Sequence, residues 1–168
     1  MRRLILMRHA KSAWNNPGIG DHDRPLNGRG KRAAQGLGDW LRTQGFLPDQ
    51  ILCSSAARTR ETLARLALPD TIPTTLTRDL YLAEASEMLA ILRQATGDCV
   101  LMLGHNGGIA DTAWRLVGDA PPKHDRFSDF PTGATLVCDF DVTTWADLAT
   151  RTARTQAFVT PHDLVGAV

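Results

Sequence analysis

The sequence is most constrained by three short segments rich in apolar residues, each followed directly by polar side chains or glycine. The segments cover residues 4–7, 49–53 and 99–103, and the first and third are continuous apolar runs. Runs of this length that do not alternate with polar residues are typical of strands buried on both faces of a parallel sheet. We therefore expect a parallel sheet with these segments among its buried strands.

Helical patterns separate these segments. Asn27 is a suitable N-cap for a helix that buries Leu37, Trp40 and Leu41 on one face and ends at Gly45. Further helices are expected between Ser54-Ser55 and Pro69, over 84–95 and over 109–117. Further strands are expected at 72–76, 135–140 and 157–159. The segments 15–26 and 118–133 are expected to be loops. Strands that alternate with helices in this way predict an α/β sandwich.

Chain length and charge limit the number of domains and the kinds of partner. The 168 residues suffice for a single domain over 1–168. Lys+Arg 19 against Asp+Glu 18 gives no strong field for nucleic acid or an acidic membrane, and no apolar run approaches the roughly 20 residues that span a bilayer. Nucleic acid and membrane are therefore not expected as partners. The three cysteines are odd in number and far apart, so we expect reduced thiols and a cytoplasmic protein.

Basic side chains follow the three apolar segments. Arg8 and His9 follow the first, Arg58 lies shortly after the second, and His105 comes after the third. Because ligands of open α/β sheets bind at the carboxyl ends of the strands, we expect these four side chains to converge there. Such a cluster repels itself unless an anion lies between its members, and arginine offers a planar set of donors that matches phosphate oxygens. The sequence therefore predicts an anion site.

Backbone groups are expected to favour the same ligand. The helices that follow the second and third strands would present free N–H groups and a partial positive charge at this edge. The glycines at 104, 107 and 108 would permit close approach of the backbone to the ligand. The predicted ligand is a phosphoryl group.

Two histidines in the cluster predict chemistry, because binding alone does not require them. A neutral imidazole nitrogen is a nucleophile, and Arg8 is expected to lower the pKa of His9 so that the ring stays neutral. We infer transfer of a phosphoryl group from the substrate to His9, followed by hydrolysis of the phosphohistidine. Arg8, Arg58 and His105 would stabilise the charge on the transferred group, so neither a metal ion nor a cofactor is expected.

Four blocks of the sequence carry a resemblance that covers nearly the whole chain. They are Arg8-His9-Ala10-Lys11-Ser12-Ala13-Trp14-Asn15, Asp23-Arg24-Pro25-Leu26-Asn27 with Gly30, Ser54-Ser55-Ala56-Ala57-Arg58 with Thr62, and Gly104-His105-Asn106. In this order they resemble the histidine phosphatase superfamily, which includes the cofactor-dependent phosphoglycerate mutases and has the signature Arg-His-Gly-Glu-Ser-x-Trp-Asn. The compact length and the segment 158–164 are similar to the small phosphohistidine phosphatase branch of that family.

The resemblance implies a three-layer α/β/α sandwich of the phosphoglycerate mutase-like type, with a mostly parallel central sheet flanked by helices. It places the site at the carboxyl edge of the sheet. The implied catalytic residues are His9 as the phosphorylated nucleophile and Arg8, Arg58 and His105 around the phosphate; the implied substrate-binding residues are Asn15 and Asn106.

Two positions depart from the family pattern. Ala10 replaces the usual glycine and Lys11 replaces the glutamate common in mutases, which weakens a mutase assignment. Many relatives have a glutamate general acid between the second arginine block and the second histidine. Glu84 is the candidate for this role, with Glu87 in reserve. The alternative is that both glutamates only open a helix, where acidic side chains favour the helix dipole.

Spacing argues against two other chemistries. A cysteine-dependent phosphatase would need five residues between Cys53 and Arg58, where this sequence has four, so Cys53 is expected to be a packing residue. A metal centre built from the His-Asp pairs at 22–23 and 124–125 matches no ligand spacing.

We therefore expect a metal-independent phosphatase that acts on a phosphorylated protein, with phosphohistidine as its substrate and inorganic phosphate as its product. A small-molecule phosphomonoester phosphatase, a mutase of the same family and a non-catalytic phosphate-binding module are the alternatives. Retention of both histidines and both arginines favours an enzyme, because binding alone could dispense with His9.

Overall fold

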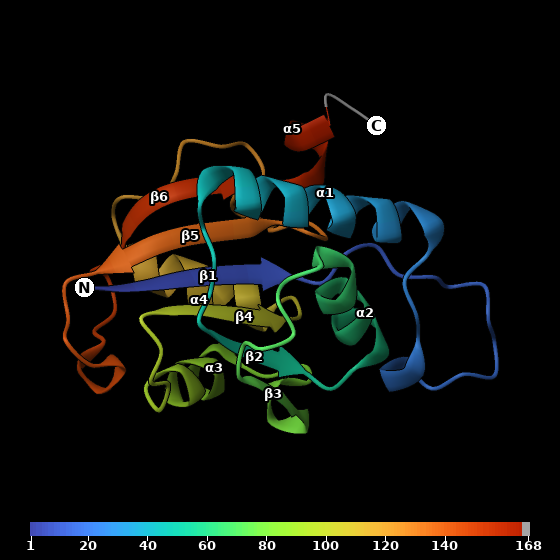
Figure 1. Ribbon diagram of the computed structural model, residues 1–168, viewed down its shortest axis with the longest axis horizontal. Coiled ribbons are helices and arrows are strands. Elements are labelled where there is room, and N and C mark those ends of the chain that lie inside the picture. The colour runs from blue at the N-terminus through green and yellow to red at the C-terminus, as the bar shows by residue number, and fades with distance from the viewer. Residues whose placement is uncertain (166–168) are drawn as a thin grey trace.

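The computed structural model describes residues 1–165, which fold around one six-stranded sheet (Figure 1). The strands are β1 (Arg2–Arg8), β2 (Gln50–Ser54), β3 (Thr74–Thr77), β4 (Cys99–Gly104), β5 (Thr135–Phe140) and β6 (Arg154–Val159). Their order across the sheet is β3-β2-β4-β1-β5-β6. The neighbours among β3, β2, β4 and β1 pair in parallel, whereas β5 is antiparallel to both β1 and β6. The predicted mostly parallel sheet is confirmed.

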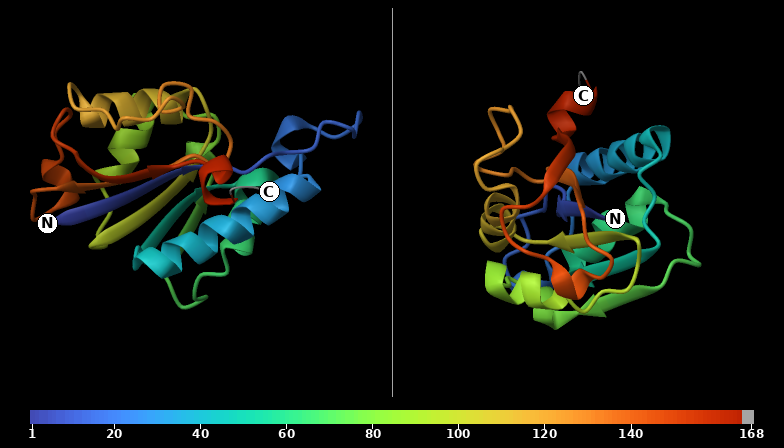
Figure 2. Two further views of the ribbon diagram at one scale, coloured as in Figure 1. Left: turned by 90° about the horizontal axis from the view of Figure 1, so that it is seen from above. Right: turned by 90° about the vertical axis from the view of Figure 1, so that its left-hand side faces the viewer.

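Helices cover both faces of this sheet, as the view from above in Figure 2 shows. They are α1 (Gly28–Gln44), α2 (Ala57–Leu66), α3 (Ala85–Leu92), α4 (Gly108–Val117) and α5 (Pro161–Val165), with short 3-10 helices η1 (Asp21–Asp23), η2 (Arg78–Leu80) and η3 (Trp145–Asp147). The helices α1, α2 and α5 pack on one face, and α3 and α4 pack on the other. The three-layer α/β/α sandwich is confirmed, although α5 is not predicted by the sequence analysis.

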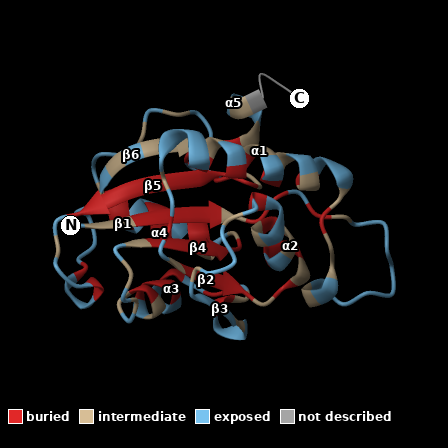
Figure 3. Ribbon diagram, viewed as in Figure 1, coloured by how far each residue is buried: buried red, intermediate tan, exposed pale blue. Residues whose placement is uncertain are grey.

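The strand β1 explains why the middle of an inner strand has no polar positions. Leu4 and Leu6 belong to the apolar core under α3 and α4, and Ile5 and Met7 belong to the core under α1 and α2. All four side chains have no solvent-exposed surface, and the inner strands are red in the burial view of Figure 3. Since both faces of the strand are buried, both must be apolar.

Caps fix the ends of α1 where the sequence predicts them. The Asn27 side chain accepts a hydrogen bond from the Gly30 backbone N–H at 2.8 Å, which satisfies a donor of the first turn. Gly45 follows the last turn with φ of 74°, a left-handed conformation that glycine adopts without strain. At the middle of α1, Gly38 lies against the Leu66 carbonyl oxygen of α2, so close that a Cβ there would come within 2.2 Å of it.

The structure corrects two predicted boundaries. The helix α3 ends at Leu92, three residues before the predicted end at 95, because the N–H groups of Gln94 and Ala95 bond to carbonyls three residues back and tighten the chain into a turn. The strand β6 begins at Arg154 rather than at residue 157, since its first residues are polar and partly exposed and carry no apolar signal.

Two broader predictions concern membrane-spanning segments and the number of domains. None of the helices in the described part of the chain has the length and apolar character needed to cross a membrane. The assignment of one domain over 1–168 stays a prediction, and residues 166–168 of it lie outside the described residues.

Candidate functional site

The register of the inner strands brings their carboxyl ends to one edge of the sheet. Arg8 lies opposite Gly104 in the pairing of β1 with β4, and Cys53 lies opposite Leu103 in the pairing of β2 with β4. The residues that follow these positions must therefore begin side by side. His9 is held at this edge by backbone hydrogen bonds from its N–H to the Gly104 carbonyl, at 3.2 Å, and from the N–H of residue 133 to its own carbonyl, at 2.9 Å.

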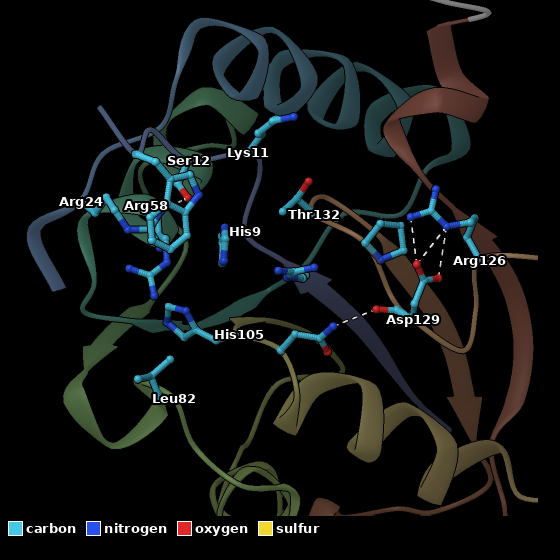
Figure 4. Close-up of a pocket in the computed structure, with 14 residues that line it drawn as sticks. His9, Lys11, Ser12, Arg24, Arg58, Leu82, His105, Arg126, Asp129 and Thr132 are labelled. Atoms are coloured by element: carbon cyan, nitrogen blue, oxygen red, sulfur yellow. Dashed lines mark hydrogen bonds and ion pairs between the residues drawn. The ribbon is translucent and has the colours of Figure 1, made fainter. Parts of the chain in front are cut away.

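The structure brings together the four side chains of the predicted anion site. Arg8, His9, Arg58 and His105 line one pocket of about 430 Å³ at the sheet edge (Figure 4). The ring centroids of His9 and His105 are 5.4 Å apart. Residues more than 90 positions apart in the sequence thus share one cavity, as the strand ends predict.

His9 is buried, and a hydrogen bond to the backbone determines which of its ring nitrogens carries the hydrogen. Its Nδ1 lies 2.7 Å from the Ala10 carbonyl oxygen, which only accepts hydrogen bonds, so Nδ1 carries the hydrogen and Nε2 carries the lone pair. Burial lowers the pKa of His9 to about 3, with smaller contributions from the charges of Arg8, His105 and Arg58. The predicted neutral imidazole is present, but burial rather than Arg8 is the main cause.

The second histidine is neutral for a similar reason. Burial, followed by the charge of Arg58, lowers the pKa of His105 to about 4. Its Nε2 lies 2.8 Å from the hydroxyl oxygen of Ser54, the last residue of β2. The Tyr81 ring lies edge-on to the imidazole with centroids 5.4 Å apart. Contacts from two other segments thus fix the orientation of His105.

Arg58 and Arg8 are both held by oxygen atoms of the protein. Arg58, in the first turn of α2, is 3% exposed, and its Nη1 and Nη2 donate to the backbone oxygen and the carboxylate of Asp21 at 2.8 and 3.1 Å. Arg8 donates from Nη1 to the Phe130 carbonyl at 3.1 Å. Burial and the charge of Arg58 lower the pKa of Arg8, so the two cations repel each other across the pocket.

Several side chains around the pocket keep a nitrogen atom without a hydrogen-bond partner in the described structure. Among residues 1–165, the Nε atoms of Arg8, Arg24 and Arg58 and the Nδ1 atom of His105 are buried and lack a hydrogen-bond partner. All four of these residues line the pocket. The guanidinium groups of Arg8, Arg24 and Arg58 surround one pocket, so an oxyanion, which accepts hydrogen bonds from such groups and offsets their charge, fits this arrangement.

An aspartate that no sequence pattern indicated, Asp21, lies behind the arginines. The Asp21 carboxylate accepts hydrogen bonds from the Tyr81 hydroxyl, from Arg58, and from Nη2 of Arg24 at 3.3 Å. These donors, the Tyr81 hydroxyl first, lower the pKa of Asp21 to about 2. Arg24 in turn lies over the face of Trp14, with its guanidinium carbon 3.6 Å from the ring centroid. Asp21 lies in a predicted loop with no periodic pattern, so the sequence alone gave no signal for it.

The segment between α4 and β5 forms another wall of the pocket. Arg126, Asp129 and residues 131–132 line it, and Figure 4 shows the Arg126–Asp129 ion pair on this side. Asn106, predicted as a substrate-binding residue, lines the pocket and donates from Nδ2 to the Asp129 carbonyl at 2.8 Å. Asn15, the other residue predicted for that role, is exposed and lies outside the pocket lining.

The structure does not bring Glu84 into the pocket with His9. Glu84 is the N-cap of α3, and its backbone N–H donates to the Glu87 carboxylate at 3.0 Å. It lines a neighbouring hollow of about 510 Å³. Gly108, expected to let the backbone approach a ligand, is instead required by packing, because a Cβ there would come within 1.9 Å of the Ala83 carbonyl oxygen. Both positions serve the contact between α3 and α4.

The alternative chemistries gain no support from the geometry. Cys53 is fully buried, and burial raises the pKa of its thiol to about 12, so it forms no thiolate nucleophile near neutral pH. His22 contacts the Ser55 hydroxyl at 2.8 Å, and His124 contacts Asp163 at 2.7 Å. Within the described residues, no group of three or more His, Cys, Asp or Glu side chains is arranged to hold a metal ion.

Comparison with known proteins shows which family has this fold. The model of the histidine phosphatase superfamily (branch 1) matches residues 4–86. A protein of Nakamurella multipartitia, proposed to be the phosphohistidine phosphatase SixA, is 36% identical, and its structure aligns over 95% of this chain and 96% of that chain with a TM-score of 0.83.

Two proteins without an assigned function are also similar. One from Mycobacterium tuberculosis is 35% identical over 163 residues, which cover 93% of this chain and 100% of that protein. A chloroplast protein of Arabidopsis thaliana is 36% identical over 130 residues, which cover 70% of this chain but only 60% of that longer protein. The similarity to the mycobacterial protein extends over nearly all of this chain.

Proposed function

This chain belongs to the histidine phosphatase superfamily, and from that membership we propose that it is a phosphatase with a phosphoryl intermediate on His9. One observation carries the proposal: a neutral, buried imidazole shares a pocket with two fixed guanidinium groups. A binding module would have no need to hold the Nδ1 hydrogen of His9 on a carbonyl oxygen and so leave the lone pair on Nε2.

The proposed reaction has two steps at phosphorus. Nε2 of His9 forms a bond to phosphorus as the bond from phosphorus to the leaving group breaks. Water then adds its oxygen to phosphorus, the Nε2–P bond breaks with its electron pair returning to Nε2, and inorganic phosphate leaves with both protons of the water. Arg8 and Arg58 would bind the equatorial oxygens in both steps, which supplies the positive charge that other phosphatases take from a metal ion. We therefore propose that the reaction is metal-independent.

We propose protein phosphohistidine as the substrate, because the pocket lining offers no carboxylic acid that is protonated near neutral pH among the described residues. Glu84 lies in the neighbouring hollow. Asp129 does line the pocket, but its hydrogen bond from Arg126 lowers its pKa, so it stays ionised. A leaving alkoxide needs a proton donor, whereas the imidazole of phosphohistidine leaves more easily.

The mouth of the pocket also supports a protein substrate. Trp14 and Leu82 line it and are 79% and 53% exposed. Exposed apolar side chains beside a functional site are typical of surfaces that contact another protein. The similarity to a protein proposed to be a phosphohistidine phosphatase points the same way.

The free thiols of the three cysteines support a cytoplasmic location, which we include in the proposal.

The test compares the parent protein with His9→Ala, and with His162→Ala as a control on the exposed surface. A phosphohistidine protein and p-nitrophenyl phosphate serve as substrates, and acid-labile phosphate on the enzyme is trapped by rapid quenching. We expect His9→Ala to lose at least about a thousandfold in kcat and all of the trapped phosphate, and the control to lose neither. Equal turnover by parent and His9→Ala would contradict the nucleophile assignment. A kcat/KM no higher for the phosphohistidine protein than for sugar phosphates would contradict the substrate.

A further inference from the structure

Asp21 makes contacts with three donors around the pocket without lining it. Arg58 donates to both the backbone oxygen and the carboxylate of Asp21, at 2.8 and 3.1 Å. The Tyr81 hydroxyl donates to the same carboxylate, and Arg24 donates to its other oxygen at 3.3 Å. Through Asp21, the short helix η1 thus contacts α2, the segment after η2 and the residue that directly follows η1.

Arg58 needs a counter-charge because of where it lies. Its side chain is 3% exposed, and a buried cation without a partner is strongly destabilising. The neighbouring guanidinium of Arg8 adds repulsion: the pKa of Arg8 is lowered by burial first and by the charge of Arg58 second. In the described part of the chain, Asp21 is the carboxylate that forms an ion pair with Arg58. Without it, the favourable response of the Arg58 side chain is to turn away from Arg8 and toward water.

The helix η1 is itself fixed to the machinery of the site. The Nε2 atom of His22, next to Asp21, lies 2.8 Å from the hydroxyl oxygen of Ser55, which begins the connection from β2 to α2. Tyr81, which donates to Asp21, presents its ring edge-on to His105. The carboxylate therefore contacts one phosphate-binding residue directly and a second one through the tyrosine ring.

We propose that Asp21 is a positioning residue that holds the Arg58 guanidinium in the geometry that binds the phosphoryl group. The inference rests on the proposed function only in taking a phosphoryl group as the ligand. It also predicts the opposite change in phosphate affinity on removal of the Asp21 carboxylate from the change that simple electrostatics predicts. A carboxylate near the pocket repels phosphate, so its removal would strengthen phosphate binding if Arg58 kept its place. Positioning predicts weaker binding instead.

The experiment measures binding of inorganic phosphate by calorimetry and turnover of a phosphohistidine protein in four variants and the parent. The variants are Asp21→Ala, Arg58→Ala, the double variant, and Asp23→Ala as a matched control. Asp23 lies on the same helix, its side chain is 75% exposed, and its carboxylate lies 3.6 Å from Nδ1 of the adjacent His22 ring. Circular dichroism melting checks that each variant is folded.

We expect Asp21→Ala to weaken phosphate binding and lower kcat/KM by roughly tenfold to a hundredfold, the usual range for a lost hydrogen bond to a charged group, and Asp23→Ala to change neither. In the Arg58→Ala background, Asp21→Ala should add no more than about threefold, because residues that act through one another are not additive.

Two results would overturn the proposal: unchanged or tighter phosphate binding by folded Asp21→Ala, or the same loss in the parent and Arg58→Ala backgrounds. Failure of the proposed function is distinguishable from either. A parent protein that binds phosphate with the expected dependence on Asp21 but turns over no substrate would refute the phosphatase and leave the positioning role in place.

Discussion

The two pocket histidines should make the protein lose stability as the pH falls from 7.5 to 5.5. In the folded protein, burial lowers the pKa of His9 to about 3 and that of His105 to about 4, so both rings stay neutral throughout this range. In the unfolded chain each imidazole returns to about 6.5. The unfolded state therefore binds protons as the pH falls through about 6.5, whereas the folded state binds them only near pH 4 and below.

The size of the effect follows from this difference. Stability falls with decreasing pH wherever the unfolded state binds more protons than the folded state. Between pH 7.5 and 5.5, protonation favours the unfolded state by about 1.4 kcal/mol for each histidine, or about 3 kcal/mol for the pair. Against a typical free energy of unfolding of about 5–15 kcal/mol, this loss is large enough to measure.

The assay is urea unfolding at both pH values in buffers without phosphate, because a bound anion would stabilise the folded state. The variant combines His9→Asn, whose amide replaces Nδ1–H, with His105→Gln, whose amide replaces Nε2. The other three histidines are common to both proteins. The free energy of unfolding of the variant should fall by about 3 kcal/mol less than that of the parent. The same pH dependence in both proteins would refute the reasoning that these rings are buried as neutral groups.

Three further predictions concern packing, the thiol and the proposed acid. Gly38→Ala should lower the free energy of unfolding by more than about 2 kcal/mol, because its Cβ would lie 2.2 Å from the Leu66 carbonyl oxygen. Gly36→Ala, with open space at its Cβ, should raise the free energy of unfolding by about 0.5–1 kcal/mol. Urea unfolding measures both. Cys53→Ser should keep turnover within about threefold, and the parent should resist iodoacetamide at pH 7.5, because burial raises the thiol pKa to about 12; rapid inactivation would contradict this. Glu84→Gln should keep turnover of a phosphohistidine protein within about threefold, since Glu84 lies outside the pocket, and a loss beyond about a hundredfold would identify it as the acid.

Burial patterns made the sheet and the core of the site predictable from the sequence. Arg8 and His9 directly follow the buried apolar run at 4–7 of β1, so the end of that run and the place of both side chains were both expected. The same holds for His105 after β4. Asn27 and Gly45 give the ends of α1, because capping depends on local backbone groups that these residue types satisfy.

Features that depend on contacts between loops were not predictable in this way. Asp21 lies in a short helix within a loop, and only the fold brings its carboxylate to Arg58 and Tyr81. The cause of the lowered His9 pKa was misjudged because burial is a property of the assembled site, whereas Arg8 is visible in the sequence. Asn15 shows the converse: the residue type matches a family motif, but the side chain lies outside the pocket lining.

Within residues 1–165, β5 is the one strand that runs against the others, and its direction determines which segment reaches the pocket. Because β5 runs against β1, it starts at the same edge where β1 ends, with Thr135 opposite Met7. The segment from 118 to 134 must therefore travel back past the sheet, and it reaches the mouth of the pocket with Arg126 and Asp129. If β5 ran parallel to β1, it would start at the sheet edge opposite the pocket, and the segment 118–134 would not reach the ligand. Under the proposed function, a change in the length or charge of that return path would change which phosphorylated target binds, without disturbing β1, after which His9 lies.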